Sequence, residues 1–318
     1  MNSIYKIFNA FPKISPGMAG IIAILIYIIL SAAKGVYVGR LAQEVHPLSL
    51  TMTCFGITWI VFLVKERQVL EKVWFIKSKV VLLNNIATAG AWGFYYLSLR
   101  ELEPAVSSAI VMGIGPLVVF ALKKNERSIQ KGIGATGIFL TLLGLVYVSS
   151  NGRTAIVEQS NTFLGLVAAL ISGISAALHS LTSKELNTAG YSPSEIMAVR
   201  FPLLIIGSVF TIFFADLGPT PTQVFQEILS HYKIIMIIAV FGQIIPLYAC
   251  QIGIEKLAAY QAAMLLSLLP VAIIPFQWLD SRLSFSYYSS SGIILMVIIV
   301  SWQVSHSRPK KLFLKHSS

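Results

Sequence analysis

Apolar residues run along this chain in ten blocks, separated by short stretches that hold charged or turn-forming residues. Each block has about 17 to 23 residues, which lets a helix rising roughly 1.5 Å per residue cross a hydrocarbon core about 30 Å thick. Helices are expected because each backbone amide inside lipid needs a hydrogen bond within its own segment. The blocks cover residues 18–38, 47–64, 80–98, 104–122, 132–149, 162–182, 194–214, 232–254, 258–279 and 287–305. The predicted fold class is an all-α integral membrane protein with ten transmembrane helices.

Composition argues against a water-soluble protein. Of the 318 residues, 56% are hydrophobic and only 12% are charged, and the mean hydropathy is +0.77. Soluble domains have roughly 25% charged residues, so this chain cannot cover itself with a polar surface. Cys54 and Cys250 both lie inside apolar blocks, which indicates small hydrophobic residues rather than a disulfide framework.

Basic residues outside the blocks predict the orientation in the membrane, because Lys and Arg stay on the cytoplasmic side during insertion. The two ends of the chain and the even-numbered loops hold 17 of them, whereas the odd-numbered loops hold 5, if Lys233 at the very edge of the block 232–254 is counted with the loop before it: Arg40, Arg100, Arg153, Lys233 and Arg282. Both termini are therefore expected in the cytoplasm, and the expected location is the bacterial inner membrane. The net charge of +11 follows from this bias, so we expect no nucleic-acid partner.

The second half of the chain repeats the first. Gly20 aligns with Gly165 at an offset of 145 residues, and Pro116 aligns with Pro270 at an offset of 154. Such a slow drift is typical of copies that differ by loop insertions. We predict two units, residues 1–150 and residues 151–318, each with five spans, the second followed by a basic cytoplasmic tail.

An odd number of spans per unit means that the second copy enters the membrane from the opposite side. Inverted repeats of this kind are characteristic of secondary transporters, in which two packings of mirrored halves expose one central site to each side in turn. The repeats therefore favour transport over catalysis.

Two stretches carry a family resemblance. Residues 99–126 read LRELEPAVSSAIVMGIGPLVVFALKKNE, and residues 253–280 read GIEKLAAYQAAMLLSLLPVAIIPFQWLD. Each is a helix entry, a run of small residues, a mid-helix proline and a short acidic turn at Glu126 or Asp280. The chain thereby resembles the EamA family of the drug/metabolite transporter superfamily, whose commoner acidic residue is Glu. Family members often have an Arg in the second helix of a unit, which is matched by Arg200 in the second copy but replaced by Cys54 in the first.

The resemblance implies a permease for small solutes such as amino acids or other metabolites, often moved outward. A phosphorylated or lipid-linked substrate is the alternative within transport. A membrane enzyme or a non-transport assembly subunit could share the composition, but an enzyme should show a deep acidic or metal-binding cluster, and none is visible.

Three potentially cationic side chains lie inside predicted spans: Lys34, His179 and Arg200. Ionised groups are costly in the membrane, so we expect them to face the interior of the bundle. The alternatives are that Lys34 snorkels to the interface, that neutral His179 bonds a neighbouring carbonyl, and that Arg200 pairs with Glu195 or with helix carbonyls. Lys34 and His179 align by the repeat, so together they could line one pathway from both sides.

No Asp or Glu lies deep in any predicted span. A cation carrier usually needs such a counter-charge, so the substrate is expected to be an anion or a zwitterion whose carboxylate meets these cations. Proton coupling could use His179, the one group among them whose unperturbed pKa lies near neutrality, although a desolvated Lys34 could also serve.

Aromatic and amide side chains complete the predicted cavity. Trp92 and Tyr96 are four residues apart and share a helix face, and Phe94 aligns with Tyr248 by the repeat. The predicted binding residues in this class are Trp92, Tyr96, Tyr248, Gln243 and Asn85. The alternative is an interfacial belt for Tyr96 and hydrogen bonding between helices for Gln243 and Asn85.

Helix breakers lie at matching places of the two copies, where they could bend the helices for gating or allow close packing: Gly113, Gly115, Pro116 and Pro270. No metal or cofactor is expected. GIGATG at residues 132–137 fits a dinucleotide pattern, but it opens an apolar helix and follows no strand. The stretch from Pro219 to His231 is expected to be a short interfacial helix.

Overall fold

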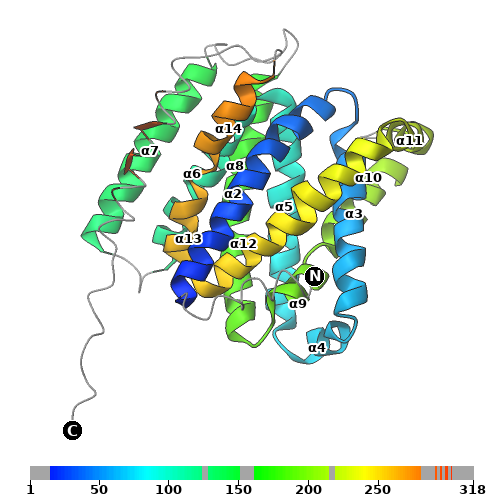
Figure 1. The fold of residues 1–318 in the computed structure, drawn as a ribbon, viewed down its shortest axis with the longest axis horizontal. Helices are drawn as coiled ribbons and strands as arrows, with labels where there is room; N and C mark the ends of the chain where they lie inside the picture. Colours follow the sequence, from blue (N-terminus) through cyan, green and yellow to red (C-terminus); the bar gives the residue numbers. More distant parts are fainter. Residues whose placement is uncertain are drawn as a thin grey trace.

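A computed structural model describes residues 15–123, 128–150, 161–214 and 219–280. In the last predicted span, 287–305, it describes only Ser291, Ile294, Leu295, Ile298, Ile299 and Trp302, so most of that span lies outside the described residues. Throughout the described part the regular structure is helical and contains no strand (Figure 1). The all-α expectation is therefore confirmed for these residues.

The helices follow the predicted blocks closely. Those of the first half are α2 (Pro16–Leu41), α3 (Pro47–Lys65), α4 (Val69–Phe75), α5 (Ser78–Glu101), α6 (Pro104–Leu122) and α7 (Ile129–Ser150). Those of the second half are α8 (Thr162–Thr188), α9 (Pro193–Val199), α10 (Pro202–Phe214), α11 (Pro221–Ile237), the π-helix η2 (Ile238–Ile244), α12 (Ile245–Lys256), α13 (Ala259–Leu266) and α14 (Leu269–Trp278). The GIGATG sequence lies within α7 and forms no strand-to-helix turn.

Seven helical stretches among the described residues are long and apolar enough to cross a membrane. They make the protein multi-pass. Helix α5 is not among the seven, although it lies in the middle of the bundle in Figure 1. Its polar residues, which include Asn84 and Asn85, reduce its hydropathy, and both asparagines are buried against neighbouring helices.

Proline follows a capping residue at the start of several helices. Ser15 precedes Pro16, His46 precedes Pro47, and each capping side chain accepts a hydrogen bond from a backbone N–H of the first turn. Proline suits this position because its missing N–H would have no partner there. Burial, together with the charge of Arg100, lowers the pKa of His46, so its Nδ1 is free to accept the bond from the helix.

Helices from the two halves interleave. Helix α5 packs most extensively against α8, and α2 packs against α12 (Figure 1). Glycine permits two of these close approaches: a Cβ atom on Gly20 would lie 2.8 Å from Cγ of Leu257, and one on Gly165 would lie 2.7 Å from Cγ of Leu102. Neither position has room for a side chain.

The expected span 194–214 is not one continuous helix, because the chain breaks at Arg200 and Phe201 between α9 and α10. Pro202 causes the break: it has no N–H to donate to the carbonyl of Ala198, which accepts a hydrogen bond from Nε1 of Trp59 at 2.9 Å instead. The next two backbone groups that lack a helical partner are the carbonyl of Val199 and the N–H of Leu203. Asn85 donates to the first at 2.6 Å and accepts from the second at 3.3 Å. Side chains of α3 and α5 thus hold the broken backbone.

The expected separate interfacial helix at 219–231 was wrong. Helix α11 begins at Pro221 and continues into η2 and α12, so residues 221–256 form one long helical stretch. The π-helix ends just before Pro246, which cannot donate a hydrogen bond to the preceding turn. The wider π turn brings Gly242 close to Lys34, where a Cβ atom would lie 2.9 Å from Cγ of Lys34.

Polar contacts tie the predicted cytoplasmic loops to one another. At this inner end Lys72 of α4 pairs with Glu195 of α9 at 2.9 Å, and Ser194 donates to Glu66 at 2.7 Å. Burial alone would raise the pKa of Glu66, but the hydrogen bonds from Ser194 and Lys65 lower it below its usual value, so the carboxylate stays ionised.

Polar contacts also tie together the loops of the opposite end. Glu227 of α11 accepts hydrogen bonds from the N–H of His46 and from Ser49, at 3.2 and 2.7 Å. His231 lies 3.1 Å from Glu44. In these contacts odd-numbered loops join odd-numbered loops and even-numbered loops join even-numbered ones, as alternating membrane crossings require.

Candidate functional site

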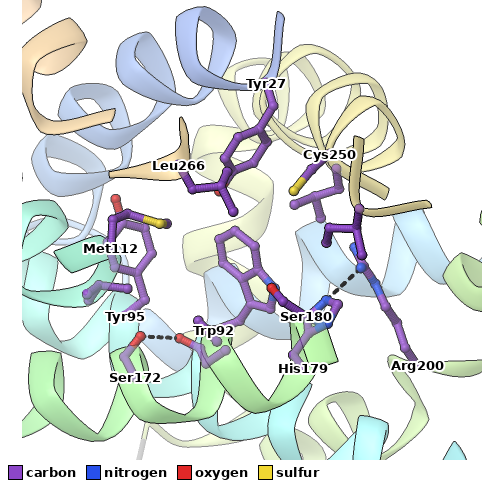
Figure 2. Close-up of a pocket in the computed structure, with 15 residues that line it drawn as sticks. Tyr27, Trp92, Tyr95, Met112, Ser172, His179, Ser180, Arg200, Cys250 and Leu266 are labelled. Carbon is purple, nitrogen blue, oxygen red and sulfur yellow. Dashed lines mark hydrogen bonds between the residues drawn. The ribbon is translucent and has the colours of Figure 1, made fainter. Parts of the chain in front are cut away.

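A small cavity of about 60 Å³ lies between the two halves of the chain. Figure 2 shows its lining, in which His179, Ser180 and Arg200 lie on one side, Ser172 and Tyr95 lie on the other, and the rest is largely aromatic or aliphatic. This volume lies below the range of small-molecule sites, roughly 300 to 1,000 Å³, so a bound solute needs the helices around the cavity to move apart. Its lining side chains come from α2, α5, α6, α8, α12, α13 and the break after α9: Tyr27, Ala91, Trp92, Tyr95, Val111, Met112, Ser172, Ala176, His179, Ser180, Arg200, Leu247, Cys250, Ile254 and Leu266.

Arg200 lines this cavity from the break between α9 and α10 and is only 2% exposed. Its Nη1 atom lies 2.7 Å from Nε2 of His179 and 3.1 Å from Oε1 of Gln251. The guanidinium also stacks on the ring of Phe201, 4.6 Å from its centroid. Among the described residues no carboxylate lies within ion-pair distance of Arg200, so the expected alternative pairing with Glu195 is wrong; Glu195 pairs with Lys72.

The contact with Arg200 fixes the tautomer of His179. A guanidinium can only donate hydrogen bonds, so Nε2 of His179 must accept and carries no proton. The ring proton is then on Nδ1, which lies 3.0 Å from Oγ of Ser183. His179 is therefore neutral in this arrangement, and a second proton on the ring would place two donors against each other.

Three buried hydrogen-bond donors at or beside the cavity have no protein partner: Nε of Arg200, Nε2 of Gln251 and Nε1 of Trp92. An unpaired buried donor costs about 1 to 3 kcal/mol. A ligand rich in acceptor oxygens would relieve this cost, whereas a ligand that only donates would not.

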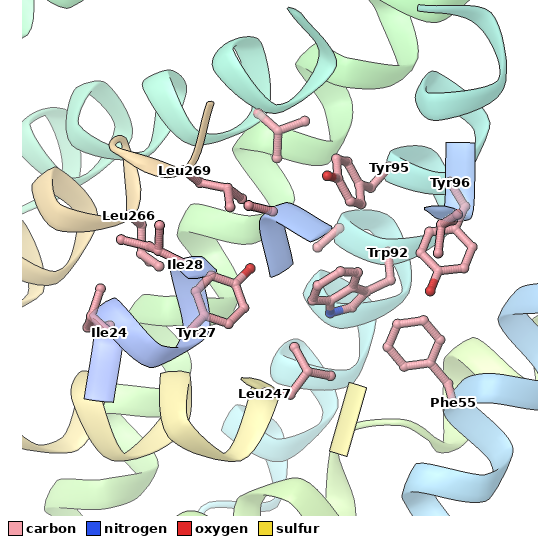
Figure 3. Close-up of a cluster of buried hydrophobic side chains, with 14 of the residues drawn as sticks. Ile24, Tyr27, Ile28, Phe55, Trp92, Tyr95, Tyr96, Leu247, Leu266 and Leu269 are labelled. Atoms are coloured by element: carbon pink, nitrogen blue, oxygen red, sulfur yellow. The ribbon is translucent and has the colours of Figure 1, made fainter. Parts of the chain in front are cut away.

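Aromatic rings form the opposite wall. Trp92 lines the cavity and packs against Phe55 and Tyr95, with ring centroids 5.2 and 5.9 Å apart. Figure 3 places Trp92 between Phe55 and Tyr96 on one side and Tyr27 and Leu247 on the other. The cluster gives the cavity a rigid apolar surface that suits a flat or aliphatic ligand body.

Lys34 does not line this cavity. It is 4% exposed, donates to Oε1 of Gln243 at 3.0 Å and lies over the ring of Trp92, 4.4 Å from its centroid. It does not snorkel to the interface, so that alternative is wrong. The structure also does not place Lys34 beside His179 along one cavity, because the cavity includes His179 and Trp92 but not Lys34.

Four other predicted binding residues lie outside the lining. Gln243 bridges Lys34 and Tyr96, donating to the hydroxyl of Tyr96 at 2.8 Å. Asn85 supports the break after α9, as described above. Tyr248 packs on Phe62, with ring centroids 5.5 Å apart. For Gln243 and Asn85 the structure shows the expected alternative, hydrogen bonding between helices.

The predicted helix breakers border the cavity indirectly. Helix α6 continues through Gly113, Gly115 and Pro116, and the carbonyl that Pro116 leaves without a helical donor, on Met112, accepts a hydrogen bond from Ser267 at 3.2 Å. In the second half the helix is interrupted at residues 267–268, directly before Leu269 and Pro270. The two copies therefore differ here: one is a continuous helix and the other is broken.

Several lining residues were missed from the sequence, and the repeat held the signal that could have found them. Tyr27 and Ser172 are separated by 145 residues, and Met112 and Leu266 by 154, the same offsets that align the two copies. Trp59, which supports the break, gave no signal because a tryptophan in an apolar block is ordinary. Cys54 and Cys250 are free thiols, and no cluster of metal-binding side chains occurs among the residues described.

These features define a multi-pass helical membrane protein with a buried cavity that Arg200 lines. Comparison with known families then gives the particular class. Residues 163–303 match the EamA-like transporter family. The match covers the second of the two motifs, residues 253–280, and confirms the resemblance to the EamA family that the motifs indicated.

The fold also occurs among solved structures, of which 18 chains match. One, described only as a crystal structure of a protein, superposes with a TM-score of 0.63 at 17% identity, covering 93% of this chain and 99% of its own. At this identity the likeness concerns the fold alone. No curated protein matches the chain significantly.

Proposed function

We propose that the protein is a secondary transporter that moves a small anionic or zwitterionic organic solute, such as an amino acid or a related metabolite, by alternating access. The observation that carries this proposal is Arg200: a buried guanidinium lines a central cavity and has no carboxylate partner among the described residues. Burial of an unpaired charge costs free energy, and a ligand that supplies the counter-charge offsets this cost. The carboxylate of the solute is that counter-charge.

The aromatic wall suggests the rest of the solute. Tyr27, Trp92, Leu247 and Leu266 offer an apolar surface, and the unpaired donors of Arg200, Gln251 and Trp92 lie at or beside the polar end. A solute that joins a carboxylate to an aliphatic or aromatic body fits this division. Its orientation would place the carboxylate at Arg200 and the body against Trp92.

Pairs of equivalent residues support the proposed inverted repeat of two five-helix units, residues 1–150 and 151–318. Tyr27 and Ser172 both line the cavity, as do Met112 and Leu266, although each pair consists of residues from different units. Two residues related by a twofold axis face one cavity when the axis passes through it. The cavity therefore occupies the place where a shared central site is expected.

The glycine contacts support the same relation. Gly20 of the first unit fits against Leu257 of the second, and Gly165 of the second fits against Leu102 of the first. Gly20 and Gly165 are equivalent at the offset of 145, and Leu102 and Leu257 at 155. Such reciprocal contacts arise when two copies exchange partners around a pseudo-twofold axis, and an axis in the membrane plane accommodates ten helices with both termini in the cytoplasm.

Contacts at the two ends supply the gates for alternating access. The inner contacts, Lys72 with Glu195 and Ser194 with Glu66, join α4 and α9 to the end of α3. The outer contacts of Glu227 join α11 to the start of α3. Opening toward one side breaks one set while the other set stays closed. The proposed location is the bacterial inner membrane, and outward transport is the direction that the family favours.

A phosphorylated or lipid-linked solute is the weaker candidate. Such a solute would favour two cations acting together, but only Arg200 lines the cavity, while Lys34 donates a hydrogen bond to Gln243 and lies over the ring of Trp92. One guanidinium suits a carboxylate better than a doubly charged phosphate that needs several donors.

The test begins with the melting temperature of the purified protein in the presence of amino acids, other carboxylates, amines and nucleotides. A carboxylate-containing compound should raise it, since a ligand that binds only the folded state stabilises that state. The same compound should accumulate in, or exchange across, vesicles that contain the protein. Stabilisation by amines and not by carboxylates would contradict the proposal, and so would binding without any movement across the membrane.

Cysteine labelling in intact cells tests the topology. Cysteine introduced at Glu44 should react with a membrane-impermeant reagent only from outside intact cells, and cysteine at Glu71 only after the membrane is opened. Equal reaction of both sites from outside would contradict the inverted arrangement. Both native thiols, Cys54 and Cys250, would first be replaced by alanine.

A further inference from the structure

Glu103 is a buried carboxyl group that the proposed transport site does not use. It forms the N-cap position of α6 and is only 4% exposed. From the sequence it lies at the end of a predicted span, where a solvated carboxylate would be expected. The structure instead encloses it between the helix ends of both units.

Gln277 of α14 connects Glu103 to the second unit. Its side-chain oxygen accepts a hydrogen bond from the N–H of Ala105 at 2.8 Å, and its amide group donates to the carboxyl of Glu103. Gln277 thus joins the first turn of α6 to α14, the helix that contains Pro270. A change of charge on Glu103 acts directly on this junction between the two units.

Two opposing effects set the proton affinity of Glu103. Burial raises its pKa to about 7, while the hydrogen bond from Gln277 favours the ionised form. The N-terminus of α6 also favours a negative charge at its cap. A proton can therefore bind and leave near neutral pH.

Two separate pairs of buried hydroxyl groups lie between the start of α6 and the cavity. Ser107 follows Glu103 by one helical turn and lies 2.5 Å, oxygen to oxygen, from Ser98 of α5. Its neighbour Ser108 lies 2.8 Å from the hydroxyl of Tyr95, which lines the cavity. All four hydroxyl-bearing residues are buried, and each hydroxyl can both donate and accept.

Other charged groups lie at the ends of the neighbouring helices, but none of them is a buried carboxyl group like Glu103. They are Arg40 at the end of α2, Arg100 and Glu101 at the end of α5, and Asp280 after α14. Arg100 and Glu101 lie 3.8 Å apart and partly offset each other, and Glu101 accepts a hydrogen bond from the N–H of Asn161.

We propose that Glu103 is a proton-binding site of the transporter, and that the proton it binds is coupled to movement of the solute. The proposal rests on the proposed function. It assigns the coupled proton to Glu103 rather than to His179, whose Nε2 is held as an acceptor by Arg200.

The step is a simple protonation. One proton adds to a carboxylate oxygen of Glu103, so the group changes from a charge of −1 to 0 and gains an O–H donor. The hydrogen bond from Gln277 to Glu103 then becomes weaker, because its acceptor is no longer charged. The junction of α6 and α14 loosens as a result. Release of the proton to water on the other side of the cycle restores the carboxylate and the junction.

The test compares Glu103→Gln with Glu101→Gln, a matched control two residues away. Vesicles containing each protein are given a pH gradient and radiolabelled L-phenylalanine, a probe that joins a carboxylate to an aromatic body. One coupled proton supports an accumulation ratio of about tenfold for each pH unit, since a factor of ten corresponds to one pH unit. We expect wild type and Glu101→Gln to respond to the gradient, and Glu103→Gln to exchange the probe without responding.

A Glu103→Gln variant that still follows the gradient would overturn the inference while leaving the proposed function intact. If wild type moves no probe, infrared titration in vesicles decides: a protonated-carboxyl band with a midpoint near pH 7 that disappears in Glu103→Gln and remains in Glu101→Gln supports the proton site. Absence of that band overturns it. If Glu103→Gln does not fold, Glu103→Asp keeps the titrating group and should shift the midpoint of the response.

Discussion

Nη1 of Arg200 lies 2.7 Å from Nε2 of His179, although the two residues are 21 positions apart and belong to different helices. The contact makes His179 the acceptor that orients the guanidinium, and leaves Nε of Arg200 without a protein partner. An arginine held in this way is positioned before a ligand arrives, which lowers the entropic cost of binding.

Arg200→Gln should weaken binding of the carboxylate solute by about 10- to 100-fold, since a hydrogen bond to a charged group contributes about 1.5 to 3 kcal/mol. Arg200→Lys should lose less, because it keeps the charge and not the forked geometry. Ligand-induced shifts in melting temperature measure both. Arg100→Gln, at an exposed helix end, is the control, and equal losses for Arg100→Gln and Arg200→Gln would contradict the assignment.

His179→Gln should keep most of the affinity, because the amide oxygen can still accept from Arg200. His179→Ala should lose about 1 to 3 kcal/mol of binding or stability by leaving a buried donor unpaired. The pH profile of transport separates two hypotheses for the coupled proton: a lost pH dependence in His179→Gln would assign it to His179, and a retained one agrees with Glu103.

The raised pKa of Glu103 predicts how stability depends on pH. Its pKa is about 7 in the folded protein against 4.5 for the free group, so the folded state holds the proton more tightly. The contribution of Glu103 to the free energy of unfolding is therefore greatest below pH 4.5 and declines as the pH rises toward 7. Above that value this group causes no further change.

Thermal unfolding of Glu103→Gln should consequently show a smaller decline over this pH range than wild type. The difference between the two melting temperatures should grow from pH 4.5 to pH 7 and then level off. Parallel curves for the two proteins would contradict a buried, titrating Glu103.

Asn85→Leu should destabilise the fold by about 1 to 3 kcal/mol for each backbone group that it leaves unpaired at the break after α9. Those groups are the carbonyl of Val199 and the N–H of Leu203. Trp59→Phe should have a smaller effect, since it removes one bond, to the carbonyl of Ala198. Melting temperatures in detergent measure both, and a smaller effect of Asn85→Leu than of Trp59→Phe would show that Asn85 does not support the break.

Gly20→Val and Gly165→Val should destabilise the protein by similar amounts, about 1 to 3 kcal/mol, because each adds atoms to a contact that has no room. Gly17→Val is the control: no heavy atom lies within 4 Å of the Cβ position there. Strongly unequal effects of the two substitutions would count against the twofold relation between the units.

The spacing of apolar blocks was enough to locate the helices. Backbone groups inside lipid have to bond within their own segment, so a long apolar run leaves little choice but a helix. The start of α3 at Pro47 and of α6 at Pro104 agrees with the expected spans to the residue. Three of the predicted binding residues, Arg200, His179 and Trp92, line the cavity; the sequence singled them out because charge and aromatic size are exceptional inside an apolar block.

The sequence could not show which face of each helix points toward the cavity. A helix that is apolar all around shows no stripe from which its buried side can be read. For this reason the sequence did not show that Gln243, Asn85, Tyr96 and Tyr248 lie outside the lining of the central cavity, or that Lys34 lines a different cavity.

By itself the sequence determined the all-helical membrane fold, the EamA family and the presence of unpaired cations within the bundle, because hydrophobic length and isolated charge act locally along the chain. Only the tertiary structure decided which cation borders the cavity and which carboxyl group is buried. Trp92 stands between Lys34 and the cavity, and helices from both units enclose Glu103. The contacts of Lys34 with Gln243 and of Gln277 with the start of α6 join residues more than a hundred positions apart, and no local pattern records them.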